Sequence, residues 1–149
     1  MKNNNSEKIN DDISIEMTAK TMFGEARGEF QRYGISSLVA IANIIRNRYM
    51  SHNNANKSIP DICLAPYQFS CWNKDDPNYE CIKDLEKNND RIYQYCLFLA
   101  KQVLEGDICD ITGGATHYYS RRMKDPPYWA KNQTPTKTIG NHIFFKLDN

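Results

Sequence analysis

A carboxylate between two glycines is the feature of this chain that most suggests chemistry. The segment Gly24-Glu25-Ala26-Arg27-Gly28-Glu29 follows an apolar, helix-like run. A glycine inside a helix costs about 1 kcal/mol relative to alanine, so two glycines four residues apart need a reason. One reason is the close approach of a ligand or another backbone, with Glu25 at the mouth of a cleft. The other is a helix end with glycine caps and solvated acids.

Glu25 has a setting that suits acid catalysis on a sugar. Cleavage of a glycosidic bond needs a carboxylic acid that stays protonated near neutral pH, and partial burial achieves this. Met22 and Phe23 precede Glu25, so the carboxyl group lies at an apolar boundary. Glu29 would share its face if the helix continues, and the two acids could then form a dyad. The sequence favours instead a surface acid at Glu29, or a pair with Arg32.

Other chemistries find less support in the sequence. A nucleophilic Cys71 would need His117 or His142 as its base, and a buried, inert thiol is the favoured interpretation. His52 and the other two histidines are isolated, without the spacing of a metal site, and the chain has no GxSxG elbow. The sequence therefore predicts neither a metal nor another cofactor.

A small number of helices and short strands must position these residues. Helical spacing predicts helices over residues 15–27, 35–49 and 90–105, with Ser14 and Asn89 as the N-caps of the first and third. The composition predicts short strands over residues 115–119 and 142–147, separated by an extended loop that contains Pro126 and Pro127. Helices first and strands last indicate an α+β fold. Residues 1–13 are polar and predict a disordered tail, which leaves residues 14–149 as a single catalytic domain.

Composition excludes several classes of protein. The chain has 149 residues with 40% hydrophobic and 25% charged side chains, which is typical of a soluble globular domain. A formal net charge of +1 argues against nucleic acid as a partner. The five cysteines include no CxxC pair and indicate free thiols in a reducing compartment. We expect synthesis in the cytoplasm without a signal peptide, and no stable insertion into a membrane.

Four blocks of sequence, in the same order, resemble the SleB-like cell wall hydrolases, which include spore-cortex-lytic enzymes and phage-type lysins. The resemblance extends over roughly residues 15–146. The blocks are Gly24-Glu25-Ala26-Arg27-Gly28-Glu29 with Val39-Ala40 and Asn47-Arg48; Gln68-Phe69-Ser70-Cys71-Trp72; Gly114-Ala115-Thr116-His117-Tyr118; and Pro127-Tyr128-Trp129-Ala130 with Ile139-Gly140-Asn141-His142-Ile143-Phe144.

The resemblance implies a lysozyme-like domain, mostly helical with a small antiparallel sheet near the C-terminus. It implies that Glu25 is the catalytic acid for the β-1,4 bond from N-acetylmuramic acid to N-acetylglucosamine. The implied reaction is lytic transglycosylation, in which Glu25 acts first as acid and then as base to form a 1,6-anhydro ring. A lysozyme-type muramidase and a non-catalytic glycan-binding protein are the alternatives.

The remaining matched residues are expected to build the substrate cleft. Hydrogen bonds to the sugars are assigned to Gln68, Ser70, Thr116 and Asn141, and stacking faces to Trp72, Tyr118 and Trp129. His117 is expected beside them as an oriented hydrogen-bonding group rather than a proton shuttle. Core packing is the alternative for each of these side chains.

The resemblance also implies where the chain works. Its partner is the glycan strand of peptidoglycan, and we expect the enzyme to be a monomer. A phage or prophage endolysin would reach the cell wall after release through a membrane pore of the holin type.

Overall fold

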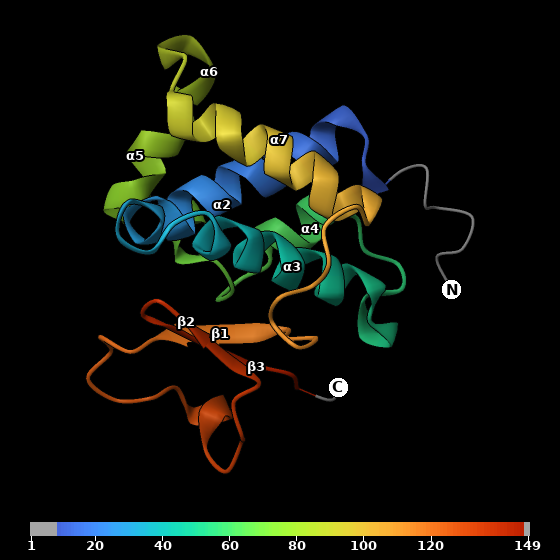
Figure 1. Cartoon of the computed structure of the whole chain (residues 1–149), viewed down its shortest axis with the longest axis vertical. Coiled ribbons are helices and arrows are strands. Elements are labelled where there is room, and N and C mark those ends of the chain that lie inside the picture. Colours follow the sequence, from blue (N-terminus) through green and yellow to red (C-terminus); the bar gives the residue numbers. More distant parts are fainter. Residues whose placement is uncertain (1–8, 148–149) are drawn as a thin grey trace.

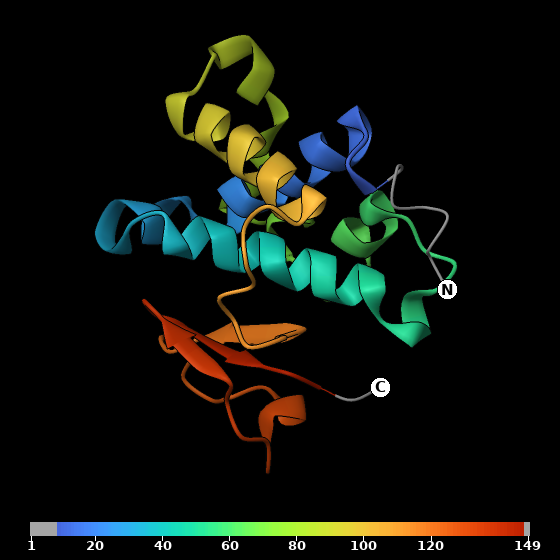
Figure 2. The ribbon, with the colours of Figure 1, turned by 45° about the vertical axis from the view of Figure 1, so that its right-hand side comes forward.

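The computed structural model describes residues 9–147 as a helical layer above a small sheet (Figure 1). The sheet lies on the α3 side of the helices in both ribbon views (Figures 1 and 2). The helices are α2 (Asp12–Tyr33), α3 (Ser36–Met50), α4 (Ile59–Leu64), α5 (Pro77–Lys83), α6 (Leu85–Asn88) and α7 (Arg91–Glu105). Three 3-10 turns are η2 (His52–Asn54), η3 (Ser70–Trp72) and η4 (Tyr128–Ala130), and the strands are β1 (His117–Ser120), β2 (Lys137–Ile139) and β3 (His142–Phe145).

The α+β class predicted from the sequence is confirmed, with an antiparallel sheet near the C-terminus. Its strand order is β1-β3-β2, and both pairs are antiparallel. In the β1–β3 pair, Tyr118 lies opposite Phe144 and Ser120 opposite His142. The sequence predicted the two paired strands β1 and β3 but not β2, because β2 is a three-residue edge strand with two exposed side chains.

Helix α2 is longer than predicted at both ends. Its N-cap is Asp11, whose Oδ1 accepts a hydrogen bond from the Ser14 backbone N–H at 2.7 Å, so the prediction of Ser14 as the cap was wrong. The helix then runs without a break through both glycines of the acidic motif to Tyr33. It ends at Gly34, which has a φ of 90°. Interior glycines cost helix stability but do not interrupt the hydrogen-bond ladder, so they did not mark an end here.

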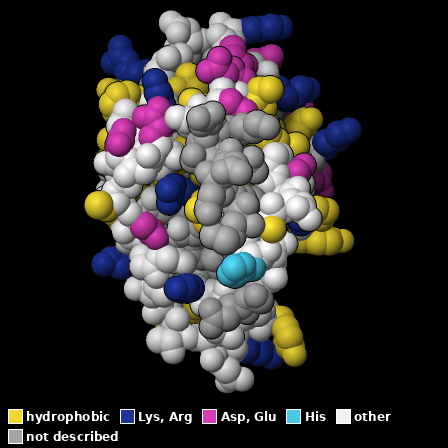
Figure 3. Space-filling model, turned by 90° about the vertical axis from the view of Figure 1, so that its right-hand side faces the viewer, with side chains coloured by type: hydrophobic (Ala, Val, Ile, Leu, Met, Phe, Trp, Pro, Cys, Tyr) yellow, Lys and Arg dark blue, Asp and Glu magenta, His cyan; other side chains and the backbone are white. Residues whose placement is uncertain are grey.

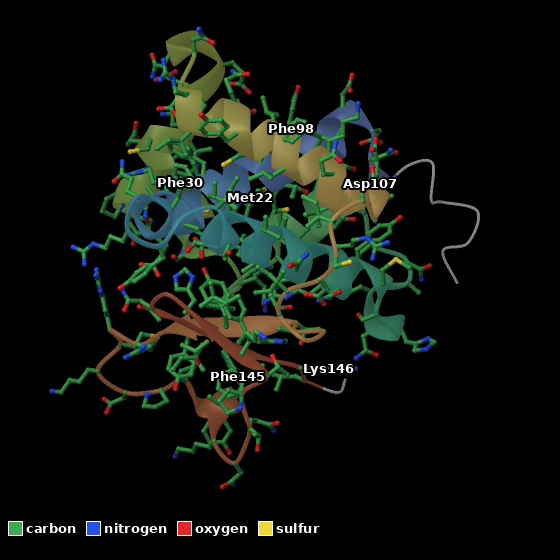
Figure 4. The ribbon with its side chains drawn as sticks, in the orientation of Figure 1. Met22, Phe30, Phe98, Asp107, Phe145 and Lys146 are labelled. Atoms are coloured by element: carbon green, nitrogen blue, oxygen red, sulfur yellow. The ribbon has the colours of Figure 1, made fainter. Side chains whose placement is uncertain are left out.

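Helices α2, α3 and α7 enclose the core. Met22 lies fully buried in the interior of the helical layer, whereas Phe98 projects outward from α7 with 64% of its surface exposed (Figure 4). The predicted span of α3 is confirmed, and α3 is buried on most of its surface. Helix α7 also matches its prediction, except that Asp90 rather than Asn89 is the N-cap. Asn89 instead adopts a left-handed conformation.

The folded domain begins before residue 14. Residues 1–8 of the expected tail lie outside the described residues. Ile9, however, is buried in the core, and α2 begins at Asp12. The prediction that the tail extends to residue 13 was therefore wrong for its last residues, because Ile9 contributes apolar surface to the same cluster as the helices.

Helix α3 holds the segment that leads into β1. The Asn43 side chain accepts a hydrogen bond from the Ile111 N–H at 3.1 Å, and the Asn47 amide donates to the Ala115 carbonyl at 2.8 Å. The buried Arg48 donates through Nε to the Thr116 carbonyl. These bonds fix the start of β1 relative to the helical layer. The Asn47-Arg48 pair of the family pattern thus supports the sheet from the helix side.

The surface carries charges of both signs. On the face shown in Figure 3, basic and acidic side chains are interspersed, in keeping with the net charge of +1. Among the helices of residues 9–147, none is both long and apolar enough to cross a membrane.

Candidate active site

A cleft between the helical layer and the sheet contains Glu25. It consists of two adjoining hollows of about 410 and 490 Å³, which share Glu25, Gly24, Asn78, Ser120 and His142. We call the first hollow the aromatic half; its other lining residues are Gln68, Ser70, Tyr118, Tyr119, Met123, Pro127 and Trp129. We call the second the charged half; its other lining residues are Arg27, Gly28, Glu29, Gln31, Arg32 and Arg122. Glu25 therefore lies where the two halves meet.

Close packing of η3 against α2 explains the first glycine of the motif. A Cβ on Gly24 would lie 2.6 Å from the Cys71 Cβ and 2.7 Å from Ile82 Cδ1. Only a glycine allows this approach, and it brings the Cys71 backbone beside the Glu25 side chain. Of the two reasons considered for the glycines, close approach therefore holds for Gly24. A Cβ on Gly28, by contrast, would meet nothing within 4 Å.

Both oxygens of Glu25 accept hydrogen bonds from outside α2. The Cys71 backbone N–H donates to Oε2 at 3.0 Å, and the Tyr118 hydroxyl donates to Oε1. Cys71 belongs to η3 and Tyr118 to β1, so the helical layer and the sheet together hold one carboxyl group. This fixes its orientation toward the cleft.

Burial gives Glu25 the properties of an acid. Desolvation raises the pKa of Glu25 above its ordinary value, although the bonds from Tyr118 and Cys71 act in the opposite direction. The negative charge of Asp76 raises the pKa further. The pKa of Tyr118 itself lies well above its ordinary value because of burial and the neighbouring Glu25, so its hydroxyl remains a donor. Glu25 can therefore hold a proton at a higher pH than an exposed glutamate.

The other carboxylates that could act with Glu25 are occupied or lie elsewhere. Glu29 is half-buried, and its Oε1 accepts from the Asn141 backbone N–H at 2.7 Å, so the expected surface acid or Arg32 pair was wrong. Asp76 caps α5 by accepting from the Asn78 N–H at 2.8 Å. Asp75 and Asp125 are exposed and line neither half. Within residues 9–147, Glu25 and Glu29 are the two acids that line the cleft.

Thiol chemistry is not supported at this site. Cys71 is fully buried, and burial together with the nearby Glu25 raises the pKa of its thiol far above the ordinary value. Burial and the charge of Arg48 lower the pKa of His117 to about 4. A thiolate–imidazolium pair is therefore disfavoured, and the predicted burial of the Cys71 thiol is confirmed. In the described part of the chain, no three histidine, cysteine or acidic side chains gather as a metal site.

Comparison with known proteins shows the family of this chain. The cell wall hydrolase family matches the chain over residues 34–145. The chain belongs to this family. The match begins after Glu25, so it does not test the role of this residue.

Two solved structures share the fold of this cell wall hydrolase. The catalytic domain of the Bacillus cereus SleB protein has a TM-score of 0.60 and 22% identity, with 89% of this chain and 88% of that chain covered. The catalytic domain of the germination-specific lytic transglycosylase SleB from Bacillus anthracis has a TM-score of 0.61 and 22% identity, with 91% and 96% covered. No curated protein matches the chain. Family membership makes the chain a peptidoglycan-degrading enzyme.

Four of the predicted substrate-binding residues line the aromatic half. Gln68 and Ser70 are exposed and line this half together with Glu25. Trp129 is half-buried, with its ring 5.2 Å from His117 and 5.3 Å from Phe145, so it combines packing with a cleft-lining face. Tyr118 also lines the cleft, but its hydroxyl is bonded to Glu25. Its predicted stacking role is therefore joined by a positioning role.

The other four predicted residues line neither half of the cleft. Trp72 donates through Nε1 to the Thr21 hydroxyl at 2.9 Å and packs against the core. Thr116 bonds to His117 Nδ1 at 2.9 Å, and both line a separate hollow of about 150 Å³. Asn141 bonds to Glu29. For these residues, the expectation of direct substrate contact is replaced by a supporting role, because their polar atoms are used within the protein.

Several lining residues were missed from the sequence. They are Asn78, Tyr119, Ser120, Met123 and His142 around the shared and aromatic parts, and the three arginines of the charged half. Tyr119 and Ser120 directly follow a block that resembles the family and that ends at Tyr118. Their place on the same strand could have indicated that they also line the cleft. Met123 carried no signal, because it lies in an irregular loop whose path depends on the fold.

The hydroxyl of Tyr118 makes a testable contribution to the pH dependence. Tyr118→Phe keeps the ring contacts with His142 and Phe144 at 4.6 and 5.8 Å but removes the bond to Glu25. Because that bond lowers the pKa of Glu25, its loss raises the pKa further. We expect the alkaline limb of the pH–activity profile to move to higher pH, and the maximal rate to fall roughly tenfold.

Initial rates of wall lysis across pH measure this effect. Tyr119→Phe is the matched control, since Tyr119 stacks on Phe145 and lies on the same strand. Its alkaline limb should stay in place. A limb that moves to lower pH in Tyr118→Phe would contradict the positioning role.

Proposed function

We propose that the chain is a lytic transglycosylase that cleaves the β-1,4 bond from N-acetylmuramic acid to N-acetylglucosamine, with Glu25 as its acid and base. The observation that carries the proposal is one half-buried carboxyl group where the two halves of the cleft meet, held by two hydrogen-bond donors from outside its helix. The fold it shares with a protein described as a germination-specific lytic transglycosylase is consistent with this reaction.

The reaction needs a single carboxyl group that changes roles. Protonated Glu25 donates its proton to the glycosidic oxygen as the bond to the muramic acid C1 breaks, and N-acetylglucosamine leaves with a free 4-hydroxyl. The resulting carboxylate then takes the proton of the muramic acid 6-hydroxyl as that oxygen bonds to C1. The product is a 1,6-anhydro ring, and Glu25 ends protonated. The bonds from Tyr118 and Cys71 stabilise the carboxylate between the two steps.

A muramidase on the same domain is the rival reaction. An inverting hydrolase needs a second carboxylate about 6.5–9.5 Å from the acid to activate water. Glu29 is the candidate in the cleft, but its Oε1 accepts from the Asn141 N–H, and its Oε2 lies 3.3 Å from the Asn141 side-chain amide. These bonds give Glu29 a structural role in holding the β2–β3 turn. This arrangement favours transglycosylation.

Mass spectrometry of the soluble products from purified peptidoglycan tests the proposal. Transglycosylation gives muropeptides lighter by one water than the hydrolytic products, because the 6-hydroxyl replaces water as the nucleophile. Products of hydrolytic mass, lost on Glu29→Gln, would establish a muramidase instead. Binding of glycan strands without any products would favour a non-catalytic glycan-binding protein.

A further inference from the structure

Arginines gather on one side of Glu25. Arg27, Arg32 and Arg122 line the charged half, whereas no lysine or arginine lines the aromatic half. Within residues 9–147, the ion pairs are Lys20–Glu86 and Lys83–Glu80, so none of these three arginines has a carboxylate partner. Glu29 offsets only part of their charge. The two halves of the cleft therefore differ in electrostatic character.

The three arginines come from two parts of the chain, helix α2 and the segment that follows β1. Arg27 lies on α2 over the Phe23 ring at 5.1 Å, and its buried Nη1 has no hydrogen-bond partner among the described residues. Arg122 follows β1, and the Asn141 side-chain amide lies within 3.3 Å of both its Nε and Glu29 Oε2. Arg32 is exposed in the last turn of α2. Arg32 and Arg122 are exposed where they line the charged half, so an acceptor that enters the cleft can bind their guanidinium groups.

The chemistry of the glycan suggests what this acceptor is. The sugar rings carry hydroxyl and N-acetyl groups, which are neutral. In intact peptidoglycan the lactyl carboxyl group is joined to the stem peptide by an amide bond, so the carboxylates nearest the glycan belong to the stem. Guanidinium groups pair with carboxylates through parallel hydrogen bonds. We propose that the charged half binds carboxylates of the stem peptide while the glycan strand crosses Glu25.

This inference rests on the proposed peptidoglycan substrate and adds a specificity for its peptide. Protonation of Glu25 favours such binding, because the neutral acid does not repel an approaching carboxylate. The prediction is an enzyme that distinguishes glycan strands by the charge of their stems, through Arg32 and Arg122 at the exposed rim of the charged half.

Binding to soluble, uncross-linked glycan strands tests the inference apart from turnover. Affinity is measured by titration calorimetry in a Glu25→Gln background, with native stems, with stem carboxylates converted to methylamides, and with stems removed by an amidase. Removal exposes the lactyl carboxylate, so this third substrate separates the two sources of negative charge. The variant is Arg32→Gln with Arg122→Gln, both exposed and tolerant of substitution, and the matched control is the exposed Arg121→Gln, which lines neither half.

We expect the double variant to lose roughly tenfold in affinity for strands with native stems, with the loss shrinking at high salt. The protein with both arginines should bind methylamide stems more weakly than native stems by a similar factor. The double variant should bind methylamide stems and native stems with equal affinity. The inference would be overturned if the double variant and the protein with both arginines bound native stems with equal affinity. So would a loss that persists on amidase-treated strands, since the lactyl group would then be the ligand. If the protein that retains Glu25 binds glycan strands but releases no soluble products, the proposed reaction is overturned. The inference about the stem carboxylates is not affected by that result.

Discussion

Glu25→Gln is expected to lower the rate of peptidoglycan cleavage by about 10²–10⁴-fold, the largest effect that we predict for a single substitution. Glutamine keeps the shape of the side chain and can still accept from the Cys71 N–H, but it has no proton to give to the glycosidic oxygen. Release of soluble muropeptides measures the effect. The matched control is Glu16→Gln on an exposed position of the same helix, which should cleave at the normal rate.

Thermal unfolding separates loss of chemistry from loss of fold in Glu25→Gln. The raised pKa means that the folded protein holds the Glu25 proton more tightly than the unfolded chain. This contribution to stability is complete below the ordinary carboxyl pKa of about 4.3 and is lost as the pH rises through the raised value. Glutamine cannot ionise and avoids that loss. The variant should therefore gain stability relative to the unmodified protein between pH 4 and pH 8.

An active Glu25→Gln enzyme would show that another group supplies the proton. An inactive variant with a lowered unfolding temperature at pH 8 would also contradict this account, because the carboxyl group would then be structural. Inactivity with a raised unfolding temperature at pH 8 is the combination that we predict.

Gly24→Ala is expected to destabilise the protein by about 1–3 kcal/mol and to impair cleavage as well. The added methyl group would meet the Cys71 Cβ at 2.6 Å and its Sγ at 2.7 Å, and the Cβ cannot move away without the backbone of η3. Relief of the clash moves η3 away from α2. That movement also carries the Cys71 N–H away from Glu25.

Gly28→Ala is the matched control on the same helix. A Cβ there meets nothing within 4 Å, and an alanine in a helix interior is about 0.5–1 kcal/mol more favourable than a glycine. We expect a modest gain in stability. Chemical denaturation of both variants, with equal m-values, measures the difference. A Gly24→Ala protein as stable as Gly28→Ala would disprove the requirement for close packing at η3.

The sequence by itself determined which segments fold locally and which face of each is buried. The period of apolar residues in α3 and α7 gave their extents, because a stripe that recurs every three or four residues can be buried only as a helix. For the two glycines of the motif, the sequence left open a close approach or a helix end; the structure shows a close approach at Gly24, where no other residue fits against Cys71. Four ordered blocks of sequence indicated the resemblance to cell wall hydrolases, which the family match over residues 34–145 confirms.

The short helices and the edge strand could not be predicted from local periodicity. Helices α4, α5 and α6 have four to seven residues each, and β2 has three. Elements of this length contain about one period of their pattern, and they are stabilised by caps such as Ser58 and Asp76 and by packing on longer helices. Their presence decides the path of the chain from α3 to α7 and hence the position of Cys71.

Only the tertiary structure decided what each functional side chain does. Glu25 and Cys71 are separated by 46 residues, and Glu25 and Tyr118 by 93, so their hydrogen bonds form only when η3 and the sheet dock against α2. The same docking turned Trp72 and Asn141 inward to partners on α2 and made the charged half of the cleft. Local periodicity records whether a side chain is buried. It does not record which segment covers that side chain, because that contact forms only when distant elements pack together.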